Sequence, residues 1–440
     1  MIQLSDHFTT KKLLQFTYPS IVMMVFMSIY GVVDGFFVLN FVGKTPFAAV
    51  NFAMPILMIL GCFGFMFGTG GSALISKKLG EGNNRKANEL FSMLIIVSLI
   101  LGLIIAIIGF IFIRPILSLL GANGDMLDNG VLYSRVIIPA LPVCFLQYAF
   151  QSLFVAAEKP KLGLYVTVAA GITNMVLDAL FVGVFKWGLI GAASATAFSQ
   201  LIGGALPVLY FWRSNSILKL TKPVFDAKAL IKICTNGSSE VMNSISMSLV
   251  GMLYNVQLLK YAGENGISAY GVLMYVNMIF ITVFIGFSIG TAPIIGFNYG
   301  AKNSIELKNI LRKSIFIISI SSVFMFISAL LLAKPLTKLF VGFDSELMAM
   351  TLRAFSIYSF CFLFCGFAIY GSSFFTALND GLTSAIISFM RTLVFQTAAI
   401  LSFPLIWGLD GIWISTVAAE ILSVLVTLFF ITSKSKVYKY

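Results

Sequence analysis

Apolar residues run in long, nearly unbroken stretches along the whole chain, and short polar segments separate them. A helix that spans a bilayer needs roughly 20 consecutive apolar residues. Twelve such stretches occur, at 14–40, 46–75, 88–113, 131–157, 162–186 and 189–212, and then at 230–260, 267–296, 308–333, 347–377, 382–405 and 410–432. The ~10-residue alternating segments of a membrane β-barrel are not seen. We therefore predict an all-α integral membrane protein with 12 transmembrane helices.

Three sequence matches recur at one spacing and indicate an internal repeat. Adding 220 takes IRPILSLLG (113–121) to AKPLTKLFV (333–341), KWGLIG (186–191) to IWGLDG (406–411), and LGEGNN (79–84) to YGAKNS (299–304). Because each half holds an even number of helices, the halves are predicted to be parallel repeats, related by an axis along the membrane normal. We predict two lobes, residues 1–212 and 230–440, joined by a polar, basic linker at 213–229.

Composition and charge support the membrane prediction. Of the 440 residues, 59% are hydrophobic and 10% are charged, against about 25% charged in soluble domains. The net charge of +12 is unevenly distributed: if the N-terminus is cytoplasmic, 20 of the 29 Lys and Arg residues fall on the cytoplasmic side and six on the other. This asymmetry follows the positive-inside rule, so we expect both termini in the cytoplasm and no nucleic-acid partner.

Several kinds of chemistry are excluded. The only GKT, at 43–45, follows Val38 where a phosphate-binding loop would need its first glycine. The single histidine, His7, lies outside the spans, so no His-based catalytic or zinc site is expected there. The five cysteines, including Cys361 and Cys365 on one helix face, are interpreted as small buried residues. We expect neither an enzyme nor a cofactor, and any uphill transport must draw on an ion gradient.

Polar residues at matched depth predict a cation site in the first half. Ionisable residues inside a span cost roughly 2.5–3.5 kcal/mol each. Counting from the outer ends of their helices, Asp34 and Thr196 lie roughly 10 Å deep and Asp178 roughly 13 Å deep. Asn174 precedes Asp178 by four residues and shares its helix face. This all-oxygen cluster suits H⁺ or Na⁺; the alternative is that these groups only hydrogen-bond the helices together.

The remaining polar positions leave alternatives open. Glu240 and Arg391 lie at similar depth, so they could form an ion pair, or Glu240 could contact substrate. Tyr133, Gln147 and Gln151 on the fourth span are candidates for lining a substrate cavity. Pro19 is predicted to be a bending point in the first span, the span that carries Asp34.

Three stretches resemble a known family. YPSIVMMVFMSIYGVVDGFFV in the first span, GTGGSALISKKLGEGN after the second and NMVLDALFVGVFKWGLIGAASATAFSQ across the fifth and sixth are similar to the multidrug and toxic compound extrusion (MATE) transporters, in particular the DinF-like, MepA-type branch. The resemblance implies a V-shaped pair of lobes in a bacterial inner membrane. It also implies exchange of organic cations for H⁺ or Na⁺.

The resemblance also implies roles for individual residues of this chain. The resemblance implies a cation-coupling role for Asp34, Asn174, Asp178 and Thr196, which would also be the Na⁺ ligands if Na⁺ is the coupling ion. It implies a hinge at Pro19 and an acidic helix 7 position at Glu240. Some members have an acidic residue in the tenth span, and residues 347–377 contain none, which puts a second-lobe cation site in doubt.

We therefore expect a monomeric secondary active exporter that exchanges H⁺ or Na⁺ for organic, often cationic, drugs. A flippase for a lipid-linked saccharide is the alternative, and it should carry cations in its cavity for an anionic sugar. The deep charges in the first lobe are acidic instead. A membrane-embedded lipid transferase would need clustered histidines or acids with metal spacing, which the sequence does not offer.

Overall fold

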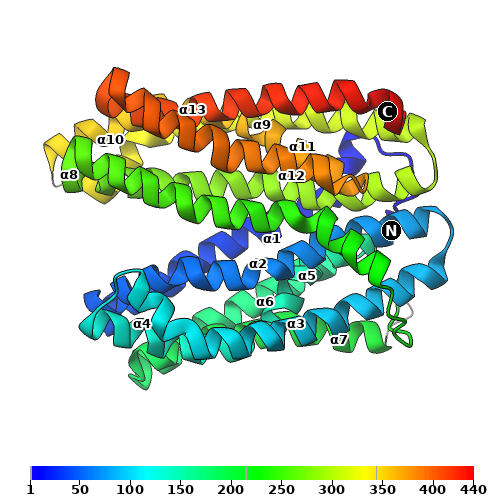
Figure 1. Ribbon diagram of the computed structural model, residues 1–440, viewed down its shortest axis with the longest axis horizontal. Helices are drawn as coiled ribbons and strands as arrows, with labels where there is room; N and C mark the ends of the chain where they lie inside the picture. Colours follow the sequence, from blue (N-terminus) through cyan, green and yellow to red (C-terminus); the bar gives the residue numbers. More distant parts are fainter. Residues whose placement is uncertain (1, 214–215, 343) are drawn as a thin grey trace.

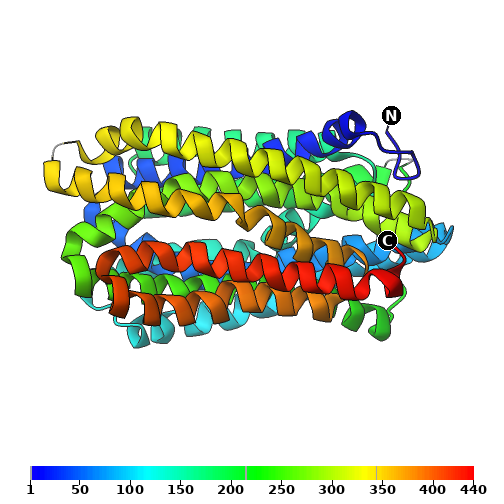
Figure 2. The same ribbon diagram turned by 90° about the horizontal axis from the view of Figure 1, so that it is seen from above.

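The computed structural model describes residues 2–213, 216–342 and 344–440, and within these ranges the chain forms a bundle of long helices without strands (Figure 1). The elements are α1 Thr10–Phe37, η1 Val38–Val42, α2 Lys44–Gly80, α3 Asn84–Leu119, α4 Gly124–Ile137, η2 Ile138–Ala140, α5 Leu141–Ala156, α6 Pro160–Asp178, η3 Ala179–Val184, α7 Gly188–Arg213, α8 Ala227–Gly300, α9 Ser304–Val341, α10 Ser345–Tyr358, η4 Ser359–Leu363, α11 Cys365–Ala377, α12 Gly381–Phe389, η5 Met390–Phe395 and α13 Gln396–Tyr438. Both ends of the chain lie at one end of the bundle, here called the termini end; the opposite end is the far end (Figures 1 and 2).

The described ranges hold 10 continuous helical segments that are long and apolar enough to cross a membrane. Two of them reverse direction at a glycine with positive φ, Gly263 (φ 61°) and Gly408 (φ 57°). The rings of Tyr254 and Tyr270 stack 5.3 Å apart, whereas a straight helix would separate these residues by about 24 Å. Each of these two segments therefore supplies two crossings. The structure is therefore consistent with the twelve predicted spans.

The predicted repeat is visible in matching irregularities of the two halves. The fourth span is interrupted by the 3₁₀ turn η2, and its counterpart in the second half is interrupted by η4. Asn83 caps α3 by accepting a hydrogen bond from the Lys86 amide (3.0 Å), and Asn303 caps α9 through the Glu306 amide (3.1 Å). Because these caps start helices inside polar sequence, α3 and α9 begin four residues before the predicted apolar starts.

A two-fold symmetric seam joins the halves at the termini end. A Cβ on Gly80 would overlap the Phe297 carbonyl oxygen, and one on Gly300 would overlap the Lys77 carbonyl oxygen. Since residues 77 and 297 are repeat mates, as are 80 and 300, this contact is the same in both directions. Because α2 and α8 both end at the termini end, the axis of this contact runs along the bundle. The structure is therefore consistent with the prediction of parallel repeats.

Closer to the middle of the bundle, α2 and α8 also meet through glycines. A Cβ on Gly237 would overlap the Met66 carbonyl oxygen, and one on Gly70 would overlap the Ile233 carbonyl oxygen. Small residues let the backbones of membrane helices approach closely. We call Gly70, Gly80, Gly237 and Gly300 the glycine seam. It holds the two halves together at the termini end.

We expect Gly237→Ala to lower the thermal stability of the purified protein, since the added methyl must push α8 away from α2. Gly251→Ala is the matched control on the same helix, because nothing lies within 4 Å of a Cβ at that position. Alanine is favoured over glycine in helices by about 1 kcal/mol, so the control should be neutral or stabilising. A thermal unfolding assay in detergent compares the two. Equal melting temperatures would contradict tight packing at the seam.

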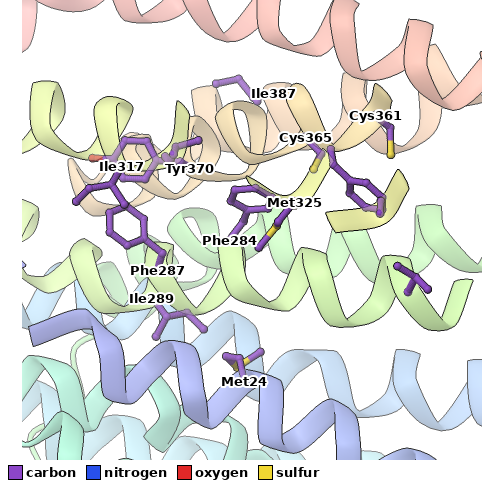
Figure 3. Close-up of a cluster of buried hydrophobic side chains, with 14 of the residues drawn as sticks. Met24, Phe284, Phe287, Ile289, Ile317, Met325, Cys361, Cys365, Tyr370 and Ile387 are labelled. Carbon is purple, nitrogen blue, oxygen red and sulfur yellow. The ribbon is translucent and has the colours of Figure 1, made fainter. Parts of the chain in front are cut away.

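The apolar core of the second half also includes part of α1. Figure 3 shows Met24 of α1 beneath Phe284, Phe287 and Ile289 of α8, and all four side chains are buried. The first helix thus packs against both halves. The same close-up places Cys361 and Cys365 among apolar side chains, in agreement with their interpretation as small buried residues.

The linker follows the surface of the first half. It was predicted at 213–229; α7 ends at Arg213 and α8 begins at Ala227, while residues 214–215 lie outside the described residues. The Lys219 amide donates to Asn88 Oδ1 (2.7 Å) and the Thr221 amide donates to Ser92 Oγ (2.8 Å), both on α3. These bonds attach the linker to one half only.

Candidate functional site

One face of α6 lies against α1 inside the first half. A Cβ on Gly171 would meet the rings of Phe26 and Tyr30 of α1 at 2.5 and 2.9 Å. Asn174 and Asp178 continue this face of α6 towards the far end, and they are 1% and 0% exposed. On α1 the same direction leads from Tyr30 to Asp34, one turn later.

The carboxyl groups of Asp34 and Asp178 lie close enough to interact directly with each other. Among the described residues, Asp34 Oδ1 and both carboxyl oxygens of Asp178 are buried without a hydrogen-bond partner of normal geometry. The nitrogen and the oxygen of the Asn174 side-chain amide are also buried without a hydrogen-bond partner of normal geometry. Buried polar groups are nearly always paired, so a cluster of such oxygens needs an explanation other than packing.

Helix geometry changes immediately beside both acids. Asp178 is the last residue of α6, and the π-helical segment η3 begins at Ala179. The π-helical segment η1 begins at Val38, one turn after Asp34. Such wide turns occur frequently at functional sites because they shift side chains out of the regular helical register.

Thr196 and Tyr133 complete the cluster. The Tyr133 hydroxyl lies beside Thr196 and close to both Asp34 and Asp178. Tyr133 is fully buried, and neither its hydroxyl nor Thr196 Oγ1 has a hydrogen-bond partner of normal geometry in the described part of the chain. The structure therefore places Tyr133, a candidate for substrate contact, within the acidic cluster.

Gln147 and Gln151 of α5 also point towards α1. Gln151 Nε2 lies 3.0 Å from the sulfur of Met27, and Gln147 lies close to the Tyr30 hydroxyl. Met27, Tyr30 and Asp34 share one face of α1. The two glutamines thus extend the acidic cluster towards the termini end as a buried polar column. They lie inside the first half rather than between the halves.

The second half carries the repeat counterpart of this cluster with different chemistry. Adding 220 takes Asp34 to Tyr254, Asp178 to Ala398 and Thr196 to Thr416. The Tyr254 hydroxyl pairs with Thr416 Oγ1 (2.7 Å) and with Gln396 Oε1 (2.8 Å). The site in the first half is therefore acidic and unpaired, whereas its counterpart has neither acid and is hydrogen-bonded within itself.

The suggested ion pair between Glu240 and Arg391 is wrong. Arg391 pairs with Glu420 of α13 through contacts of 2.8–3.0 Å; Glu420 is buried, and the Arg391 side chain is largely buried. Glu240 lies next to Cys62 of α2, on the side of α8 that faces the first half. It forms no ion pair with any side chain that the structure describes. Equal depth could not identify the partner, because depth does not fix which way a side chain points around its helix.

Glu420 and the Tyr254 network were missed at the sequence level. Glu420 stands ten residues into the span predicted at 410–432, so the depth criterion that selected Asp34 would have selected it too. Tyr254 and Thr416 follow from adding 220 to Asp34 and Thr196. Pro19 lies buried within α1, fifteen residues before Asp34, which is about 22 Å along the helix.

Twelve crossings, two parallel repeats and an intramembrane acidic cluster define a multi-pass membrane transporter. The model of the MatE family matches residues 19–180 and 241–399, once in each half. The chain belongs to the MatE family, which is a family of transporters and not of enzymes.

Individual relatives are distant but match almost end to end. The multidrug export protein MepA of Staphylococcus haemolyticus is 25% identical over 428 residues, covering 96% of this chain and 93% of the relative. MepA of Staphylococcus aureus strain MRSA252 is 24% identical over 425 residues, with the same coverage. A solved structure of a multidrug resistance MATE family transporter in an outward-facing conformation superposes with a TM-score of 0.92 at 22% identity, covering 98% of this chain and 97% of that one. This similarity supports the fold.

Proposed function

We propose that this protein is a secondary active multidrug exporter that exchanges H⁺ or Na⁺ for organic, often cationic, compounds. One observation carries the proposal: two adjacent buried carboxyl groups in the first half lie among unpaired oxygens, whereas the repeat-related residues of the second half, Tyr254 and Ala398, are not acidic. Membership of the MatE family and similarity to multidrug export proteins agree with it.

The cluster has the chemistry needed to exchange one cation for another. Two neighbouring carboxylates in a low-dielectric interior repel each other, so a proton or a cation must compensate their charge. Asp34 and Asp178 would hold the coupling ion, while Asn174 and Thr196 would supply further oxygen ligands if that ion is Na⁺. Binding of the coupling ion then removes the negative charge that attracts a cationic drug.

We also propose roles for the other polar residues near the acidic cluster and for the proline of α1. Tyr133, beside the acids, would link substrate binding to the state of the cluster. Gln147 and Gln151 would offer hydrogen bonds to substrate deeper in the first half, with Glu240 as an acidic contact at the interface with the second half. Pro19 would be the hinge through which α1 responds to ion binding, because proline weakens the helix at that point.

Transport would proceed by rocking of two lobes, 1–212 and 230–440, connected by the linker 213–229. The glycine seam closes the termini end, and opening this end would require the seam to separate. The charge asymmetry of the sequence supports a cytoplasmic position for the termini end. In this proposal the protein would act as a monomer in a bacterial inner membrane. In the described residues the deep acids of the first lobe do not favour the saccharide flippase, whose anionic substrate they would repel.

The proposal is tested by ethidium efflux from proteoliposomes under a pH gradient or a Na⁺ gradient, imposed separately. We expect one gradient to drive efflux well above the rate without a gradient. The same assay identifies the coupling ion. An efflux rate that neither gradient changes would contradict ion-coupled export.

A further inference from the structure

The segment before α1, residues 2–9 and here called the strap, is docked onto the second half. The Phe8 amide donates to Glu306 Oε1 (2.9 Å), and His7 Nδ1 lies 2.7 Å from Glu306 Oε2. The Phe8 carbonyl in turn accepts from Asn309 Nδ2 (3.1 Å) and from the Lys313 ammonium. All three partners lie in the first turns of α9, and Glu306 is only 5% exposed.

The strap is also attached to the first half. The Leu4 amide donates to Glu158 Oε1 (2.7 Å), in the turn between α5 and α6. Leu4 and Phe8 are 0% exposed. Both belong to the apolar cluster of the second half, which reaches the α5–α6 region only through Val155 and Leu164. The strap thus connects two regions that belong to different repeats.

The repeat counterpart of the strap makes a related attachment through an ion pair. Adding 220 takes residues 2–9 to 222–229, the end of the linker, and takes Lys86 to Glu306. Asp226 pairs with Lys86 of α3 (2.8 Å), so this counterpart also attaches to the start of the third span of a half. Asp226 also caps α8 by accepting from the Ala229 amide (3.0 Å), so its pair with Lys86 joins the start of the second half to the first half. Lys86 holds the pKa of the Asp226 carboxyl below its usual range.

We propose that the strap is a latch that holds the two lobes closed at the termini end. The amides that bind Glu158 and Glu306 belong to residues four positions apart in the chain, and a segment of that length spans at most about 14 Å when extended. When the lobes tilt apart at this end, at least one of the two attachments must break. The latch therefore stabilises the closed state and adds to the barrier to opening. This inference rests on the proposed rocking of the two lobes.

The experiment measures the distance between spin labels on the two lobes. Arg85→Cys and Lys308→Cys place labels on exposed positions of α3 and α9 at the termini end, in a background with the five native cysteines replaced by alanine. Electron–electron resonance distances are recorded in nanodiscs, with and without ethidium. We expect Glu306→Ala to raise the open-to-closed ratio about tenfold, as expected for losing hydrogen bonds to a charged group.

Two further variants make the outcome decisive. Glu158→Ala cuts the attachment to the first half and leaves α9 intact, so it should raise the ratio even if Glu306→Ala folds poorly. Lys434→Ala is the control: it cuts an ion pair with Asp380 (2.6 Å) that lies within the second half at the termini end, and it should leave the ratio unchanged. An unchanged ratio in folded Glu158→Ala protein would overturn the latch. A wild-type protein that never shows a longer distance, with or without ethidium, would instead count against the rocking of the lobes.

Discussion

Replacing either Asp34 or Asp178 with asparagine should abolish drug export while the protein still reaches the membrane. Asparagine keeps the size of the side chain but can neither take up a proton nor offer a negative charge to Na⁺. Because three of the four carboxyl oxygens of these acids are buried without a hydrogen-bond partner of normal geometry, neutralising one acid also removes a desolvation cost. We therefore expect unchanged or higher thermal stability together with drug resistance no greater than that of cells lacking the protein.

The repeat supplies a matched control for this prediction. Tyr254 occupies the position of Asp34 in the second half and bonds to Thr416 and Gln396. Tyr254→Phe removes both bonds, so it should lower stability by roughly 1–2 kcal/mol and leave export working. Resistance assays and thermal unfolding on the same variants separate the two effects. Full resistance in both asparagine variants would show that the acids do not couple ion and drug.

The fold could be predicted from the sequence because hydropathy and helix length are set by the bilayer. All twelve spans are present, including the two pairs that only Gly263 and Gly408 separate. Helix ends were predicted less well, since a prediction from hydropathy ends the helix where the sequence becomes polar, even if the helix continues. Asn83 and Asn303 begin helices within polar sequence through a side-chain hydrogen bond. The glycine seam could not be predicted, because contact between backbones depends on how the helices pack.

The candidate site was partly predictable for a similar reason. A fixed rise per residue converts sequence position into depth, and it placed Asp34 and Asp178 at one level, where the structure brings them together. Direction around a helix is not fixed in this way. Depth alone could therefore not show that Arg391 turns to Glu420 rather than Glu240, or that Gln147 and Gln151 face α1.

The buried pair of Arg391 and Glu420 should be a large determinant of stability. Arg391→Gln and Glu420→Gln each leave one charge unpaired in the interior of the second half, which costs about 3–5 kcal/mol for a buried pair. The double variant Arg391→Met with Glu420→Leu removes both charges and should recover most of that loss. Unfolding in detergent and the yield of monodisperse protein measure the effect.

The pair of Arg353 and Asp410 provides the comparison, because it also joins an arginine to a carboxylate but at an exposed site. Its arginine is 69% exposed, against 12% for Arg391. An exposed ion pair contributes about 0–1 kcal/mol, so Asp410→Asn should have little effect. The loss of stability on removing a charge partner would then depend on how deeply the ion pair is buried and not simply on its presence. If the apolar double variant is as unstable as the single variants, the loss of stability does not come from an unpaired charge, and the prediction is contradicted.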